Sequence, residues 1–447
     1  MLFGAGLPIF FLEMALGQYA GVGPIKIFGR IAPILQGLGY AVVSVGVLLA
    51  FFYNVVVSWS LWYLAVSVNS LIVPESRLEW AYCDHDYNSK CCRSAMNESM
   101  LNASAHLCNL TWTSSVEEYW GNHVLSSTNY DWNHFGTPRF YSMLCLSGAW
   151  AIIACCLIKG VKTSGRVSYV TSFLPYILLI ILAVRSFSLP GAQDGLREYF
   201  RPNWDSLKNI EIWIDAAKQI IFSLGPACGC VITLSSYNHF HRNSQRDAVA
   251  IAVANSLTSL FSGSVVFAIL GYMAHESGKP VLSVVKGGPG LAFLVYPEVV
   301  LKLPSSSLWA TLFFAMLISL ALGSIFGAFE TVITACTDFW PRLRDHKPQL
   351  VIGLATLMTI LGLTFTCPGG IHMFTLFNNC APSWNLIVFA FLEVVLMAWV
   401  YGVDNFLDNI VDMLGGLHPI SKVFIVPPIF FLFTRFYLSF RKSLVLL

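Results

Sequence analysis

The chain has 447 residues, of which 56% are hydrophobic and only 11% are charged, and its formal net charge is +2. A soluble protein carries about 25% charged residues, so this composition argues against a soluble domain and predicts a protein that crosses a membrane several times. The small net charge and the lack of a run of basic residues argue against nucleic acid as a partner.

Long apolar stretches predict ten membrane-spanning helices. They cover residues 2–20, 38–71, 141–158, 167–187, 213–240, 247–274, 309–337, 350–378, 384–402 and 420–440. Pro427, Pro428 and Arg435 interrupt the last of them. The expected fold class is therefore an all-α polytopic membrane protein.

Positive charges fall in alternate connections between these spans, which indicates the orientation of the chain. They are Lys26 and Arg30; Lys159, Lys162 and Arg166; Arg242 and Arg246; and Arg342, Arg344 and Lys347. The positive-inside rule makes these connections cytoplasmic, so the long loop 72–138 is expected outside the cell.

Two features of loop 72–138 agree with that orientation. Three sequons for N-glycosylation, which is confined to the lumen or the cell exterior, begin at Asn97, Asn102 and Asn109. The loop also holds four cysteines that are plausible disulfide partners in an oxidising compartment, namely Cys83, Cys91, Cys92 and Cys108. We expect an extracellular loop that is glycosylated and disulfide-linked.

The span 213–240 contains Gly225-Pro226-Ala227-Cys228-Gly229 at its centre. Proline removes a backbone donor and glycine adds backbone freedom, so a break in the helix is expected there. Two half-helix ends of opposite partial charge would then face one cavity, which suits a small zwitterion and its ions. The alternative is a kinked helix with no ligand, because proline and glycine are tolerated in membrane helices.

Several polar residues within the spans are candidates for function. Glu13 carries a charge at membrane depth, where an unpaired charge costs several kcal/mol. Ser223 and Asn255 offer uncharged oxygens of the kind that sodium prefers, although Asn255 alone could serve a hydrogen bond between helices. Tyr53 lies near the middle of its span, away from the interfacial belt where tyrosine is common.

Three motifs carry a resemblance to a known family. Trp213 to Phe240 reads WIDAAKQIIFSLGPACGCVITLSSYNHF, and GLPIFFLE at 6–13 and LGQY at 16–19 precede it. The first resembles the sixth membrane helix, and the other two the second helix, of the neurotransmitter:sodium symporters, which carry amino acids and amines with sodium and chloride. The resemblance covers nearly the whole chain and implies an inverted-repeat (LeuT-like) transporter fold, with residues 1–447 as one membrane domain. Since the family has twelve helices, its first and last are expected to be absent here.

The resemblance implies a substrate pocket in which the hydroxyl of Tyr53 holds the substrate carboxylate. The remaining lining residues would be Leu49, Phe222, Ser223, Leu224, Cys228, Ser324 and Ile325. Cys228 is smaller than the aromatic residue of several relatives, so it either leaves more room for the substrate or is inert packing.

The resemblance also implies ion sites. Ser223 and Asn255 match the first sodium site, and Leu320 and Ser324 match the second. Gly323 stands where many relatives have aspartate or threonine, which removes a side-chain oxygen from the second site. The chloride site would comprise Gln219, Ser223, Asn255 and Ser259. The neutral Ser259 fits chloride dependence.

Supporting and gating roles follow from the same resemblance. Glu13 would brace the unwound segment rather than contact substrate, and Cys83 would pair with Cys92. Glu393 would be the acidic half of the extracellular gate, and Asp338 with Tyr237 would form the intracellular one. Their arginine partners are expected in family segments that this chain lacks.

We therefore expect a secondary active symporter in the lipid bilayer of the plasma membrane. Sodium and chloride would drive uptake of a small neutral amino acid such as glycine, with no other cofactor and no enzymatic activity. LSSYN and the segment GPGLAF at 288–293 resemble the amino-acid and GABA branches more than the monoamine branch. The alternative is a truncated, non-transporting form that associates with a full-length transporter, and a homo-oligomer is compatible with either. A channel or receptor is a distant third hypothesis.

Overall fold

The structure is a computed structural model that describes residues 1–73, 77–94, 113–127, 130, 132–158, 161–278, 280–284, 291–381 and 383–415. Within these ranges the regular secondary structure is helical, as predicted, apart from the short parallel pair β1 (Cys92–Arg93) and β2 (Thr113–Ser114). Seven of the described helical segments are long and apolar enough to cross a membrane, or eight if a bent pair counts as one span.

The helices of the first half are α1 (Leu7–Ala20), α2 (Pro24–Ile31), α3 (Gln36–Ile72), α4 (Ser115–Glu118), α5 (Phe140–Leu157), α6 (Val161–Phe187), α7 (Ala192–Phe200), α8 (Ile210–Leu224) and α9 (Cys230–Ser235). Those of the second half are α10 (Ser244–Ser277), α11 (Val281–Val284), α12 (Tyr296–Leu301), α13 (Ser306–Phe339), α14 (Lys347–Gly362), α15 (Gly370–Cys380), α16 (Trp384–Val395) and α17 (Val403–Leu414).

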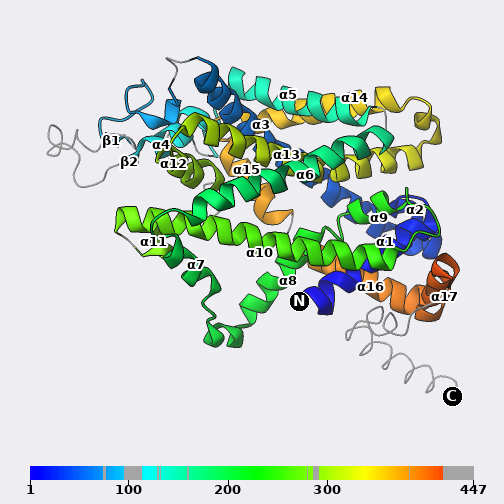
Figure 1. Cartoon of the computed structure of the whole chain (residues 1–447). Coiled ribbons are helices and arrows are strands. Elements are labelled where there is room, and N and C mark those ends of the chain that lie inside the picture. Colours follow the sequence, from blue (N-terminus) through cyan, green and yellow to red (C-terminus); the bar gives the residue numbers. More distant parts are fainter. Residues whose placement is uncertain are drawn as a thin grey trace.

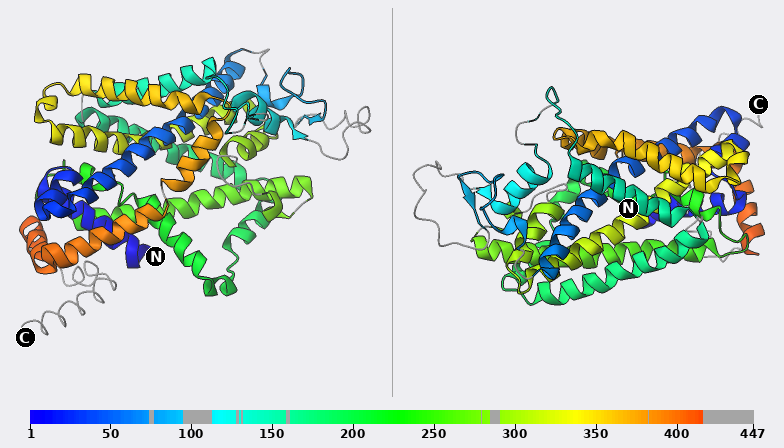
Figure 2. Two further views of the ribbon diagram at one scale, coloured as in Figure 1. Left: turned by 180° about the vertical axis from the view of Figure 1, so that it is seen from behind. Right: turned by 90° about the horizontal axis from the view of Figure 1, so that it is seen from above.

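The long helices run roughly side by side, and the two ends of the bundle differ in character (Figure 1). The strands β1 and β2 lie at one end, with the disulfide loop. The opposite end carries α2, which contains Lys26 and Arg30, and the connection after α9, which contains Arg242. The views from behind and from above show the same separation (Figure 2). This arrangement agrees with a positive cytoplasmic end opposite an extracellular loop.

The predicted span 350–378 is wrong as a single helix. Helix α14 ends at Gly362, a short turn covers Leu363–Thr366, and α15 begins only at Gly370. The cause lies in Cys367-Pro368-Gly369, because proline cannot donate to the helix and disfavours helical backbone in the residue before it. Helix α16 begins at the predicted residue 384. The predicted end at residue 402 falls on Gly402, whose φ of 94° separates the preceding helical turn from α17. The predicted span 420–440 and the three sequons lie outside the described residues.

Helices α3 and α13 form the centre of the described packing. Phe52 and Tyr63 of α3 belong to the same buried cluster as Phe313 and Phe314 of α13, and the rings of Tyr63 and Phe314 stack at a centroid distance of 4.7 Å. Buried aromatic rings contribute large apolar areas, so this pair forms a firm wall beside which the site is built.

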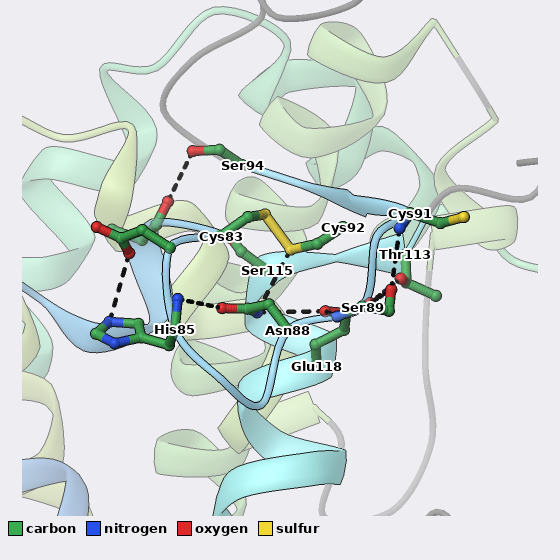
Figure 3. The surroundings of a disulfide bond; sticks show 12 residues. Cys83, His85, Asn88, Ser89, Cys91, Cys92, Ser94, Thr113, Ser115 and Glu118 are labelled. Carbon is green, nitrogen blue, oxygen red and sulfur yellow. Dashed lines mark hydrogen bonds and ion pairs between the residues drawn. A yellow bond between two sulfur atoms is a disulfide. The ribbon is translucent and has the colours of Figure 1, made fainter. Parts of the chain in front are cut away.

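The loop after α3 is held together by a disulfide and by one carboxylate (Figure 3). The disulfide joins Cys83 to Cys92, the pair that the family resemblance implied, and Cys91 is also disulfide-bonded. The buried Glu118 of α4 accepts hydrogen bonds from the Ser89 N–H at 2.8 Å and from the side chains of Asn88 and Thr113. These contacts tie Asn88, Ser89 and Thr113 to the start of α4.

Candidate functional site

The helix predicted to break at Gly225–Gly229 is interrupted there: α8 ends at Leu224 and α9 begins at Cys230. Gly225, Ala227 and Gly229 all have left-handed backbone, with φ values of 78°, 61° and 75°. The conformation is natural for the glycines, but for Ala227 it stores strain of about 1–3 kcal/mol, which surrounding contacts must offset. The break is therefore a feature that the rest of the molecule holds in place.

Glu13 of α1 supplies one of those contacts. Its side chain is fully buried, and its carboxylate accepts a hydrogen bond from the backbone N–H of Ala227. This is the contact that a supporting role requires, and it satisfies a backbone donor that lipid could not satisfy.

Glu393 lies in a different place from the one we predicted. We expected the acidic half of an extracellular gate, but the side chain is fully buried on α16 and interacts with Glu13. A gate residue must meet water when the gate opens, whereas this carboxyl group lies against the support of the break. The structure thus groups Glu393 with Glu13.

A cavity of about 670 Å³ lies beside the break. Its walls come from α3, from the segment that joins α8 to α9, and from α13. All eight residues predicted for the substrate pocket line it, namely Leu49, Tyr53, Phe222, Ser223, Leu224, Cys228, Ser324 and Ile325. The carbonyl end of α8 opens beside the same space, so the cavity offers dipoles as well as apolar surface.

The cavity extends further than the sequence indicated. Phe10 and Met14 of α1 line it, and towards the positively charged end it reaches Asn238, Arg242 and Asp247. Arg242 and Asp247 form an ion pair there. In the sequence, Arg242 serves only as a marker of orientation. The one sign of the ion pair there is an acidic residue, Asp247, five positions after Arg242.

Two of the predicted ion ligands meet across a helix interface. The Asn255 side chain of α10 donates a hydrogen bond of 2.8 Å to the Ser223 hydroxyl of α8. Ser259 lies one turn further along α10, and its hydroxyl donates to the backbone oxygen of Asn255 at 2.9 Å. Gln219 precedes Ser223 by one turn of α8. The Ser223–Asn255 bond therefore joins α8 to α10, while Gln219 and Ser259 lie one turn away from it on their own helices and are exposed.

The residues predicted for the second sodium site, Leu320 and Ser324, lie one turn apart on α13. Ser324 and its neighbour Gly323 line the cavity on α13. Leu320 is half exposed and is not part of the cavity wall. Of the two predicted residues, only Ser324 therefore lines the cavity.

Asp338, at the positively charged end of the molecule, has partners within the chain that the sequence analysis did not predict. Its carboxylate accepts the Gly23 N–H at 2.7 Å and lies 3.0 Å from Arg344 and 3.5 Å from Lys26. The sequence marked both cations only as signs of orientation, because they lie on α2 and on the turn after α13, which only packing brings together with Asp338.

Tyr237 belongs to a second network beside Asp338. Its hydroxyl donates to Glu330 at 3.2 Å and hydrogen-bonds Thr334 at 2.8 Å, while Lys347 lies 2.7 Å from Glu330. Asp338 and Tyr237, the expected gate pair, thus belong to two neighbouring networks, both of which include residues of α13. Together they join α2, the α9–α10 connection and α14 at one end of the bundle.

Comparison with known proteins adds a family match. Residues 1–440 match the sodium:neurotransmitter symporter family. The sodium- and chloride-dependent GABA transporters 2 of mouse (Mus musculus) and rat (Rattus norvegicus) are each 40% identical to this chain over 418 residues, which is 93% of this chain and 68% of theirs. The human (Homo sapiens) protein of that name is 39% identical over 418 residues, with the same coverage.

Proposed function

Because the chain belongs to the sodium:neurotransmitter symporter family, we propose that it uses sodium and chloride gradients to take up a small neutral amino acid across the plasma membrane. Members of this family are multi-pass membrane transporters, so the protein is a transporter and not an enzyme. Its ions are cargo or bound partners of the transport cycle.

The cavity beside the broken helix is the observation that carries this proposal. It brings Tyr53 of α3 and Ser324 of α13 to the same space as the unwound segment 225–229. Irregular backbone is tolerated at membrane depth where it lines such a cavity, and broken helices mark the binding sites of transporters. The tyrosine hydroxyl would donate to a substrate carboxylate, and the free carbonyls at the end of α8 would face cations.

The substrate is proposed to be GABA or a similarly small zwitterion, with glycine as the competitor. Glycine was the expectation from the sequence, but the relatives at 40% identity are named as GABA transporters. GABA separates its amine from its carboxylate by more carbons than glycine does, so it needs a longer pocket. A cysteine at position 228, and a cavity of about 670 Å³, leave room for that length.

The ion sites belong to the proposal as well. Ser223 and Asn255 would bind the first sodium ion, and Ser324 with backbone oxygens of α13 near Leu320 would bind the second. Chloride would lie among the polar groups of Gln219, Ser223, Asn255 and Ser259. The Ser223–Asn255 hydrogen bond supports this reading, because it shows that the two helices already approach closely enough to share a ligand.

Uptake of radiolabelled GABA and glycine by cells that express the protein tests the proposal. We expect uptake that disappears when sodium is replaced by an organic cation and falls when chloride is replaced by gluconate. Tyr53→Phe removes only the hydroxyl and should reduce uptake at least tenfold, since hydrogen bonds to charged groups contribute about 1.5–3 kcal/mol. Tyr40→Phe, an exposed position on the same helix, is the matched control. Normal surface expression without uptake of either compound would refute the proposal and favour the non-transporting alternative.

A further inference from the structure

Cys228 and Cys230 flank Gly229 in the break, and both line the cavity. The two side chains interact with each other. Neither thiol is in a disulfide, and Cys228 is buried while Cys230 is partly exposed. The molecule thus presents two adjacent thiols on one cavity wall, and neither the ion sites nor the substrate site requires the second of them.

Both thiols are held in place by the backbone of the break. The Cys228 thiol donates to the Gly225 carbonyl oxygen at 2.8 Å, and the Cys230 thiol points at the Cys228 carbonyl oxygen at 3.8 Å. Gly229 between them has a φ of 75°, and a Cβ there would lie 3.1 Å from the Thr331 methyl group of α13. The turn that pairs the thiols is therefore fixed by its conformation and by its neighbours.

We propose that Cys228 and Cys230 form a dithiol site for thiophilic ligands that enter the cavity, with trivalent arsenicals and soft metal ions as the ligand class, and that a bound ligand holds the break rigid and stops transport. Thiol sulfur selects soft ions over sodium, so the site would not compete for the transported cation. Binding of the ligand to the two thiols does not depend on the proposed function. The claim that the bound ligand stops transport does rest on the proposed function.

The chemistry is balanced for phenylarsine oxide as the probe. Two arsenic–sulfur bonds form, the arsenic–oxygen bond breaks, and the oxygen leaves as water with the two thiol protons. Arsenic remains trivalent, so no oxidant or reductant takes part. Capture by the first thiol makes the second bond intramolecular, which strengthens binding by orders of magnitude over a single thiol.

The chain supplies its own control pair. Cys155 and Cys156 are direct neighbours in sequence, but they lie on the uninterrupted helix α5. Neighbouring residues of a helix point in directions about 100° apart, so they do not face each other as a chelating pair. The α5 pair thus tests whether two neighbouring cysteines are sufficient for binding without the geometry of the break.

The experiment measures arsenical binding by intact-mass spectrometry on the purified protein and, in parallel, uptake by cells. We expect one phenylarsine unit at low probe concentration, released by dithiothreitol and resistant to an equal concentration of the monothiol 2-mercaptoethanol. Cys230→Ser and Cys230→Ala should each weaken binding by roughly 100-fold or more. The Cys155→Ser/Cys156→Ser double variant should bind as the wild type does.

The outcomes separate the two steps of the proposal. Dithiol-reversible binding that survives both Cys230 substitutions, or that is lost in the α5 double variant, would overturn the site. Binding at the site without inhibition of sodium-dependent uptake would overturn the locking step. If the wild type shows no uptake at all, the proposed function fails while the mass measurement still decides the site.

Discussion

Gly225 and Gly229 offer a direct measurement of how tightly the break is packed. Both have left-handed backbone, with φ values of 78° and 75°. A Cβ on Gly229 would lie 3.1 Å from Thr331, 3.2 Å from Pro24 and 3.3 Å from Val42, whereas a Cβ on Gly225 would meet no atom within 4 Å. Alanine would therefore be strained in its backbone at both positions, but its Cβ would be crowded by neighbouring atoms only at position 229.

The expected destabilisation follows from these two contributions. Left-handed backbone costs a residue with a Cβ about 1–2 kcal/mol, which applies to both substitutions. Crowding a packed interior with an extra methyl group costs about 1–3 kcal/mol, which applies to Gly229→Ala alone. We expect losses of about 1–2 kcal/mol for Gly225→Ala and about 2–5 kcal/mol for Gly229→Ala.

Thermal unfolding of the purified protein in detergent checks this order, and it requires no transport assay. The midpoint should fall from wild type to Gly225→Ala and further to Gly229→Ala. Thr331→Ser removes the nearest methyl group and keeps the hydroxyl that donates to the Gly327 carbonyl oxygen at 2.9 Å. Combined with Gly229→Ala it should recover part of the loss, and Thr331→Ser alone gives the baseline of the double-mutant cycle. Equal midpoints for the two glycine variants would refute the claim that Thr331, Pro24 and Val42 crowd position 229.

Three further predictions concern the loop, the chloride site and the orientation. Glu118→Ala leaves the Ser89 N–H and its neighbours without their acceptor, which costs about 1–3 kcal/mol, so the Cys83–Cys92 disulfide should be reduced faster in an alkylation assay. The exposed Asp86→Ala in the same loop is the control, and equal rates for the two variants would count against the bracing role. Ser259→Glu should permit uptake without chloride, since a fixed carboxylate near sodium replaces the bound anion; continued chloride dependence would remove Ser259 from the site. Replacing Asn97, Asn102 and Asn109 together by glutamine should abolish the mobility shift that glycosidase produces on the wild type, and a wild type with no shift would contradict an extracellular loop.

Much of the architecture could be predicted because lipid imposes strict local rules. A backbone in lipid must satisfy its own hydrogen bonds, so each long apolar run, such as the one now seen as α3 (Gln36–Ile72), has to be helical. The break at Gly225–Gly229 was predictable for the converse reason, since proline and glycine there disrupt the local hydrogen bonding. The same signal at Pro368 and Gly369 was present in the sequence, and we gave it too little weight.

The resemblance to a family extended the prediction to the cavity. It selected eight lining residues from three separate helices, and the structure brings all eight to one space. Local pattern could not have done this, because Leu49, Phe222 and Ser324 are far apart in the chain and individually unremarkable for membrane helices.

The partners of the buried charges were decided by tertiary structure alone. Glu393 meets Glu13 across 380 positions of chain, and Asp338 meets Gly23 and Lys26 across more than 300. In a soluble helix the apolar face shows which side is buried, but in a membrane helix lipid and protein interior are both apolar, so the sequence carries little record of which face meets which helix. An isolated acid in such a helix shows that a partner is needed, and only the packing of the helices determines which residue provides it.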